Sequence, residues 1–401
     1  MSSDRHRYIV AVDFGTTFTG LSKIKIGSDL GLILTYYLTG VALVDSTQTS
    51  LEDIDVYRNW PGKAKGQHEI WKTPSKIAYR HENTHVRIMS SSNKDEEIWG
   101  YHITDDMDCY WWFKLRLDQD GPMTTHDDSS LASLAQTREG IMKLPAGKEP
   151  VDVCADFLRG IYNFVMSDLS RMWGAHIVEA TPIDFWITHP ATWSDRAKLR
   201  TKAAASRAGL GTREHDKIYM ISEPEAAAVA TLSKLVRPGI ANQVKAGDGG
   251  KQIRLNTRLQ HSPSTVLICD CGGGTVDLTT YLIKSTTPKL EFEELAVGQG
   301  AKIGSTFINR FFHSWCTVHF GHAYTEMPYK RIGPGSLFMN TFESFKRDFG
   351  DEGCREDEYS VPLVMHGVED SPNYDRDTAM ITFTQYVNSL SNDEHALTPQ
   401  Q

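Results

Sequence analysis

The chain has 401 residues, of which 40% are hydrophobic and 23% charged, which is typical of a globular protein long enough for two hydrophobic cores. Its formal net charge is -9, and lysines and arginines are interspersed among the acids, so no basic stripe is available to follow a nucleic-acid backbone. The six cysteines lack paired CxxC spacing, which argues against a structural zinc site or a disulfide framework and favours a reducing, cytoplasmic location.

Neither a secretory signal nor a membrane-spanning helix is predicted. The first seven residues are polar, and the apolar run that follows them is too short for the core of a signal peptide. The longest uncharged apolar stretch, residues 30–44, falls short of the roughly 20 residues that a spanning helix needs. We therefore expect no membrane partner.

The first predicted element is a strand over residues 8–12, followed by an acid and a glycine turn. The run is apolar and rich in β-branched residues, as buried strands are. Asp13 ends it, and Gly15, Thr16 and Thr17 come next. Backbone N–H groups of such a turn can approach phosphate oxygens closely, because glycine has no Cβ and tolerates positive φ.

Two segments interrupt the expected pattern. Residues 21–40 separate the first turn from residues 41–45, which look like the strand that should complete a hairpin, and removing them would leave DFGTTFTGVALVDST. Removing residues 249–264 would likewise leave AGDTVLICDCGGGT. We hypothesise that both segments are insertions, such as translated introns, and sequencing the mature transcript would decide this.

Between the two glycine turns the pattern is mostly α/β. The predicted elements are, in chain order, a helix over 150–169, a strand over 184–188, a helix between 194 and 209, a strand over 218–221 and a helix that begins at 223. Ser194 is a suitable N-cap and Gly209 a suitable C-cap for the second of these helices. In the last third, residues 305–320 and 337–349 are predicted helical, and residues 380–383 are predicted to form a strand.

A second unit of strand, acid and glycine turn begins at residue 265. The strand 265–269 ends in Asp270, and another strand-like run extends to residue 283. The polar and glycine residues of this turn are Gly272, Gly273, Gly274, Thr275 and Asp277. One such turn is most often an ordinary hairpin, but two of them predict a duplicated architecture whose facing loops hold a phosphate. Asp13, Asp270 and Asp277 would offer hard oxygen ligands to a hydrated Mg²⁺.

Other phosphate-binding loops are absent from the sequence. There is no GxxxxGK[ST] loop, and no GxGxxG follows a predicted strand to open a helix.

The motifs resemble those of the seventy-kilodalton heat-shock proteins, which belong to the actin-like ATPase superfamily. IVAVDFGTTFTG at 9–20 and VLICDCGGGTVDLTTY at 266–281 are similar to that family's two phosphate motifs. Further similar segments are KTPSKIAY at 72–79, ITHPATWSDRAKLRTKAAASRAGL at 187–210, ISEPEAAAVA at 221–230, VGQGAKIGSTFINRFF at 297–312 and FESFKRDF at 342–349. These segments are most similar to the divergent branch of the family that is common in fungi.

The resemblance implies a two-lobed α/β fold, the duplicated ribonuclease-H-like fold of actin-like ATPases. The first nucleotide-binding lobe, with its crossing helix, would cover residues 1–236, and the second would cover residues 237–401. The second lobe is expected to be incomplete, because no Gly-rich turn like the family's late adenosine motif follows residue 383 and no peptide-binding domain follows either. We therefore interpret the chain as truncated at its C-terminal end.

The resemblance also assigns roles to individual residues. Asp13, Asp270 and Asp277 would hold Mg²⁺, and Asp270 and Asp277 would act in catalysis. The phosphate cradle would be Gly15, Thr16, Thr17, Gly272, Gly273, Gly274 and Thr275. On the adenosine side the expected contacts are Gly304, Glu343, Lys346 and Arg347.

Two further catalytic residues are implied, each with a structural alternative. Glu223 would help to orient the attacking water, or else serve as a first-turn acid that stabilises the dipole of its helix. Lys114 would lie near the γ-phosphate, or else cover a cluster of aromatic rings with its stem. For Glu343 and Lys346 the alternative is a solvated i,i+3 ion pair.

Three functions remain open at this stage. The leading one is Mg²⁺-dependent binding of ATP or ADP with slow hydrolysis, as in the ATP-binding domain of a chaperone that would meet cochaperones and client proteins. The second is a truncated, noncatalytic nucleotide-binding remnant. The third is a sugar or metabolite kinase of the same fold, although no signature of a base over a sugar pocket is present.

Overall fold

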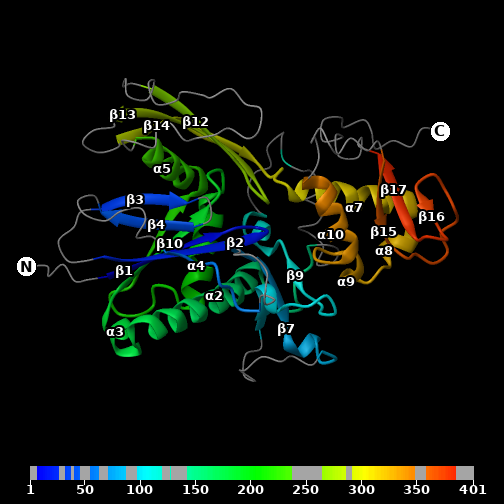
Figure 1. Cartoon of the computed structure of the whole chain (residues 1–401), viewed down its shortest axis with the longest axis horizontal. Helices are drawn as coiled ribbons and strands as arrows, with labels where there is room; N and C mark the ends of the chain where they lie inside the picture. The colour runs from blue at the N-terminus through cyan, green and yellow to red at the C-terminus, as the bar shows by residue number, and fades with distance from the viewer. Residues whose placement is uncertain are drawn as a thin grey trace, which may run out of the picture.

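The computed structural model describes the backbone over most of the chain. The described residues are 7–26, 32–37, 40–45, 55–62, 71–86, 97–119, 127, 142–236, 264–285, 291–347 and 358–384. They form a mixed α/β fold, so the expected α/β class is confirmed. Its two main sheets lie on opposite sides of helix α5 (Figure 1).

The first lobe is built around a mixed sheet. Its strands follow the order β11-β10-β1-β2-β5, with β6 also paired to β2. Their bounds are β1 Arg7–Phe14, β2 Phe18–Ile26, β5 Asp55–Val56, β6 Lys72–Pro74, β10 Ile183–His189 and β11 Lys217–Ser222. Strands β10 and β11 run parallel to β1, whereas β2 is antiparallel to it. The central strands β1 and β10 are buried, as parallel strands usually are.

Strand β2 corrects the expected hairpin. We expected residues 41–45 to complete it, but β2 continues directly from the turn through residue 26, with Val12 opposite Leu21 and Tyr8 opposite Lys25. Strand β4 (Gly40–Asp45) instead pairs with β3 (Leu32–Tyr37). The segment 18–26 has several polar residues, so its pattern was less apolar than that of 41–45, yet it needs no long connection to pair with β1. The origin of residues 21–40 stays a hypothesis, and residues 249–263 lie outside the described part.

Helices cover the first sheet. They are α2 (Pro150–Trp173), α3 (Ala175–Ala180) and α4 (Asp195–Ala208). The predicted caps of α4 are confirmed: Ser194 Oγ accepts the N–H of Ala197 at 3.2 Å, and Gly209 has φ +110°. In the main hydrophobic core of the lobe, α2 and α4 pack against β1 and β10, and this packing holds the strand ends that carry the site.

Helix α5 (Glu223–Val236) lies between the two lobes. On one side Ala226, Val229 and Ala230 pack with Ala11 of β1, and on the other Ala228 and Leu232 pack against the second sheet. That sheet is antiparallel, in the order β12-β13-β14. Its strands are β12 (Ser264–Cys271), β13 (Val276–Ser285) and β14 (Glu291–Ala301). The division of the chain into lobes at residue 236 stays a prediction, because residues 237–263 are not described.

The remaining elements lie at the edges of this frame. A small sheet of β7 (Lys76–Tyr79), β8 (Glu97–Trp99) and β9 (Tyr110–Trp111) extends the first lobe, together with the 3₁₀ turns Arg80–Glu82, Gly100–His102 and Phe113–Asp118. The C-terminal part of the described chain comprises α7 (Thr306–Phe320), α8 (His322–Thr325), α9 (Tyr329–Ile332), α10 (Leu337–Arg347), β15 (Glu358–Pro362), β16 (Tyr374–Asp375) and β17 (Met380–Thr384). Its core stacks Phe312 on Phe342, with ring centroids 4.1 Å apart.

Within the described ranges, no helix is both long and apolar enough to cross a membrane. Residues 385–401, whose sequence lacks the late adenosine motif expected from the resemblance, are not described.

Candidate functional site

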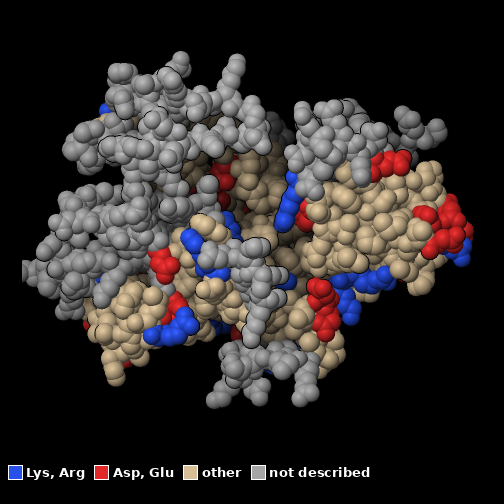
Figure 2. Space-filling view, viewed as in Figure 1, with Lys and Arg blue, Asp and Glu red and all other residues tan. Residues whose placement is uncertain are grey.

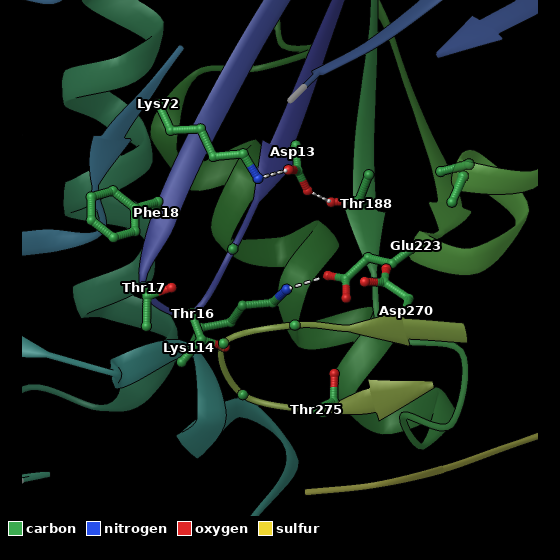
Figure 3. A pocket seen from close by; sticks show the side chains of 16 residues that line it. Asp13, Thr16, Thr17, Phe18, Lys72, Lys114, Thr188, Glu223, Asp270 and Thr275 are labelled. Atoms are coloured by element: carbon green, nitrogen blue, oxygen red, sulfur yellow. Dashed lines mark hydrogen bonds and ion pairs between the residues drawn. The ribbon is translucent and has the colours of Figure 1, made fainter. Parts of the chain in front are cut away.

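The two glycine turns meet in one cavity. It measures about 210 Å³ and is lined from both lobes (Figure 3). A Cβ built on Gly273 would lie 2.5 Å from Thr17 Oγ1, and one built on Gly274 would lie 2.4 Å from Thr16 Oγ1. The second turn therefore touches the first, and only glycine allows this approach without displacing the threonines. In the space-filling view, charged side chains of both signs lie along the hollow between the lobes (Figure 2).

The lining contains most of the phosphate residues expected from the sequence. These are Asp13, Gly15, Thr16, Thr17, Asp270, Gly272, Gly273, Gly274 and Thr275, together with Lys114 and Glu223. The cavity is smaller than the roughly 300 Å³ of the smallest typical ligand pockets. Its size and its charged and hydroxyl-bearing side chains suit a group as small as the phosphate end of a nucleotide.

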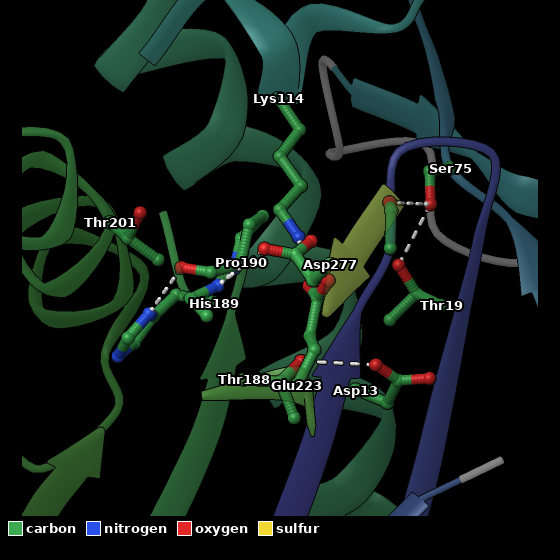
Figure 4. Close-up of polar contacts among 12 residues, drawn as sticks. Asp13, Thr19, Ser75, Lys114, Thr188, His189, Pro190, Thr201, Glu223 and Asp277 are labelled. Atoms are coloured by element: carbon green, nitrogen blue, oxygen red, sulfur yellow. Dashed lines mark hydrogen bonds and ion pairs between the residues drawn. The ribbon is translucent and has the colours of Figure 1, made fainter. Parts of the chain in front are cut away.

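Ser75 fixes the first turn. Its N–H donates to the carbonyl of Thr17 (2.8 Å), and its hydroxyl donates to the carbonyl of Gly15 (2.7 Å). The same hydroxyl lies 2.8 Å from Thr19 Oγ1 (Figure 4). These bonds hold the carbonyls of Gly15 and Thr17, and the N–H of Gly15 donates to the carbonyl of Asp13 at 3.1 Å, so the shape of the turn is fixed by the protein itself. Ser75 lies in the segment KTPSKIAY, but this role could not be predicted because Ser75 comes about sixty residues after the turn.

The start of α7 fixes the second turn in a similar way. The N–H groups of Gly304, Ser305 and Thr306 donate to the carbonyls of Gly274, Gly272 and Gly273, at 3.1, 3.0 and 2.8 Å. A Cβ on Gly304 would lie only 2.5 Å from the carbonyl carbon of Gly274. Gly304 was expected to contact nucleotide, but it lies behind the turn and does not line the cavity. Its visible role is to let α7 pack against the backbone of the turn.

Asp13 and Asp270 face the cavity from opposite lobes. Thr188 Oγ1 donates to Asp13 Oδ1 at 3.0 Å (Figures 3 and 4). Burial opposes ionisation of Asp13, but Lys72, Lys114 and Thr188 outweigh it and hold the pKa of this carboxyl below its ordinary value. The pKa of Asp270 is raised, first by burial and then by the charges of Asp13 and Asp277. Among the described residues, the Asp270 side chain has no hydrogen-bond partner, so its oxygens are available to a ligand.

Asp277 lies beside Asp270 but is used differently. Only 1% of it is exposed, and it does not line the cavity. Its Oδ1 accepts from the N–H groups of Ala191 and Thr192, at 3.0 and 3.3 Å, and from the Thr192 hydroxyl at 3.3 Å. This carboxylate of the second lobe therefore ties down the loop after β10 of the first lobe.

Lys114 and Glu223 form a buried ion pair in the cavity wall. Lys114 Nζ lies 2.7 Å from Glu223 Oε1, and the two side chains are 2% and 15% exposed. Burial raises the pKa of Glu223 to about 7, against the opposing pull of Lys114 and with help from the charge of Asp13. The ammonium group of Lys114 also lies 5.5 Å from the ring centre of Phe14 and 5.2 Å from that of Trp193. Lys114 therefore lines the cavity, and the rings near its charge are Phe14 and Trp193, not the aromatic residues next to it in sequence; its role toward a γ-phosphate stays a prediction.

Lys72 is a site residue that the sequence reasoning missed. It lines the cavity, and its Nζ lies 2.9 Å from Asp13 Oδ2 (Figure 3). The only available signal was its place at the start of KTPSKIAY, which was noted as a family segment without a role for its first residue. Its partner is far away in the sequence, so pairing could not be read from spacing.

The donor set does not fit a metal ion held directly by three carboxylates. Asp277 is engaged with backbone N–H groups, and Lys72 occupies one oxygen of Asp13. No cluster of three or more His, Cys, Asp or Glu side chains suited to hold an ion is found in the part of the chain that the structure describes. The site does offer the Asp270 carboxylate and the hydroxyls of Thr16, Thr17 and Thr275, which suit a hydrated ion bound to phosphate.

The residues expected on the adenosine side form a group of their own on α7 and α10. Lys346 Nζ lies 2.6 Å from Glu343 Oε1 and 2.7 Å from Asn309 Oδ1, and Asn309 donates to Glu343 Oε1 at 2.5 Å. Arg347 is exposed. None of these residues lines the cavity, so the i,i+3 ion pair is present and a contact with nucleoside stays a prediction.

No family model matches the chain. Heat shock 70 kDa protein 12A of Mus musculus is 26% identical over 376 residues, covering 84% of this chain and 50% of that protein. Heat shock 70 kDa protein 12B of Homo sapiens is 25% identical over 395 residues, covering 88% and 51%. Chaperone protein HscA of Proteus mirabilis is 27% identical over 203 residues, covering 51% and 25%.

Among solved structures, MreB5 of Spiroplasma citri bound to ADP matches with a TM-score of 0.41 and 12% identity, over 96% of this chain and 73% of that one. The chain spans about half the length of the two heat shock 70 kDa relatives. In sequence it is distantly similar to the heat shock 70 kDa proteins.

Proposed function

We propose that the chain binds ATP or ADP through its two glycine turns and hydrolyses ATP slowly. The observation that carries this proposal is the single cavity in which both turns meet, with Asp13 and Asp270 on opposite walls. The distant relation to heat shock 70 kDa proteins supports the same class of ligand. A chaperone role with cochaperone or client partners belongs to this proposal and is supported by the resemblance alone. A cytoplasmic location also belongs to it and is supported by the unpaired cysteines.

The residues of the cavity have distinct tasks in this proposal. Backbone N–H groups of the two turns and the hydroxyls of Thr16, Thr17 and Thr275 bind phosphate oxygens. Lys114 places a positive charge beside the phosphoryl group that is transferred. Glu223, in its ionised form, orients the attacking water and accepts its proton. A Mg²⁺ ion bound with the nucleotide would neutralise charge on the phosphates, with Asp270 placed to bind its water shell.

Asp270→Ala tests this proposal. Because Asp270 has no partner within the described residues, its removal should leave the fold intact and lower the affinity for Mg-ATP by about five- to tenfold, as the loss of a contact of about 1–1.4 kcal/mol would. Isothermal titration calorimetry measures this. The matched control is Asp195→Ala, an exposed acid at the start of α4, which should bind as the wild type does. Wild-type protein that takes up no Mg-ATP would refute the proposal.

A noncatalytic nucleotide-binding protein is a second candidate, and one contact favours it. Lys114 already occupies an oxygen of Glu223, so the group that should orient water is held in an ion pair before any nucleotide arrives. A single-turnover assay with radiolabelled ATP separates the two candidates, because the noncatalytic protein would bind ATP and release it unchanged.

A further inference from the structure

Lys72 has a defined place at the mouth of the first glycine turn. It lies on β6, opposite Gly20 of β2, and its carbonyl accepts the hydroxyl of Tyr101 at 3.1 Å. The sheet therefore holds its backbone, and its side chain extends to Asp13 Oδ2 at 2.9 Å (Figure 3). With Thr188 on the other oxygen, both oxygens of Asp13 have donors from the protein itself.

The charge of the cavity shows what this lysine changes. The described lining carries three carboxylates, Asp13, Glu223 and Asp270, and two ammonium groups, Lys72 and Lys114. Lys114 is already paired with Glu223. Without Lys72, the carboxylates of Asp13 and Asp270 would both face the phosphates with no protein cation at hand, and like charges at such close range repel strongly.

The position beside Asp13 is also where a cation would otherwise be needed. A nucleoside triphosphate brings several negative charges into the cavity, and a divalent ion usually offsets them. Here an ammonium group stands next to the carboxylate, as a compact point charge on a flexible stem with three donors. Its stem can turn toward a phosphate oxygen without leaving the cavity, since about a third of the side chain (31%) is exposed.

We propose that Lys72 is a resident cation of the nucleotide site, which neutralises Asp13 and binds phosphate, so that nucleotide binding depends only weakly on divalent metal. The inference rests on the proposed function, because it concerns how the same cavity accepts ATP. It concerns binding, and it leaves Mg²⁺ free to assist hydrolysis.

The test compares metal dependence between variants. The dissociation constant for ATP is measured by calorimetry in Mg²⁺ and in EDTA, and the ratio of the two constants gives the metal dependence. The wild type should show a ratio below about ten, whereas Lys72→Met should show a ratio at least about tenfold larger, because metal must then offset both carboxylates. Lys72→Arg keeps the charge and should stay near the wild-type ratio.

Two further variants control for indirect effects. Lys76→Met alters a lysine on β7 that lies outside the cavity, over the ring of Trp111 at 5.0 Å, and should keep the wild-type ratio. The double variant Asp13→Asn/Lys72→Met removes both charges and should bring the ratio back toward the wild type, although binding itself weakens. Thermal unfolding of each variant shows that it is folded.

The outcomes separate the inference from the proposed function. Equal ratios in the wild type and in Lys72→Met, or a large ratio in the wild type, would overturn the inference while ATP binding stands. If no variant binds ATP in either condition, the proposed function fails and the inference fails with it.

Discussion

Glu223 shows how one residue combines a structural and a chemical task. It begins α5, where a carboxylate is favourable next to the free N–H groups of the first turn. The same position puts it in the cavity wall against Lys114. Burial brings its pKa to about 7, which is the range in which a carboxylate can both hold and release a proton near neutral pH.

This pKa gives a testable pH dependence. The ionised carboxylate is the form that accepts a proton from water, so the rate of ATP hydrolysis should rise as the pH passes upward through about 7 and then level off. Glu223→Gln should remove this rise and lower the rate by about a hundredfold or more. A pH–rate profile of both proteins between about pH 5.5 and 8.5 checks this. A wild-type rate that falls through the same range would contradict the role given to Glu223.

The elements around the site act mainly by holding the two turns. Ser75 binds the carbonyls of the first turn, and the N–H groups at the start of α7 bind those of the second. Each turn thus has carbonyls that accept hydrogen bonds from a distant part of the chain, which holds its backbone in place. Neither contact involves residues close in sequence, so the precision of the turns depends on the packing of β6 and α7.

Gly304→Ala tests the packing of α7 against the second turn. The added Cβ would meet the backbone of Gly274 and Thr275, at 2.5 and 2.6 Å, which cannot move aside as a side chain could. We expect the free energy of unfolding to fall by about 1–3 kcal/mol and nucleotide affinity to fall with it. Ser305→Ala, the exposed neighbour that keeps its backbone N–H, should change the stability by less than about 0.5 kcal/mol. Denaturant titration measures both, and equal stability of the two variants would argue against a packing role.

Local patterns predicted most of these elements, and the site only in part. Helix α4 could be read from its caps, and the two strand-acid-turn units from their apolar runs and glycines. The predicted pairing partner of β1 was wrong. The apolar segment 41–45 matched the pattern of a buried strand better than segment 18–26, which has both polar and apolar residues and is the one that pairs with β1. Lys72 and the backbone ties of Asp277 could not be found, since their partners are distant in sequence and become neighbours only through the sheet order.

At the scale of the whole molecule, the lobes are linked by contacts outside the cavity as well as at the turns. Asp277 of β13 binds the loop after β10, and Lys302 of the second lobe forms an ion pair of 2.8 Å with Asp118 of the first. Helix α5 packs against both sheets. These contacts hold the lobes in register around one cavity, so a ligand in it would contact both lobes at once and stabilise their association.

Hydrogen exchange of the backbone N–H groups tests most directly whether the two turns share one nucleotide. We predict that ATP slows exchange in peptides covering residues 14–18 and 272–275 together, at the same nucleotide concentration, because N–H groups from both turns bind the same phosphates. Protection of one turn alone, or of neither while nucleotide is bound, would contradict it.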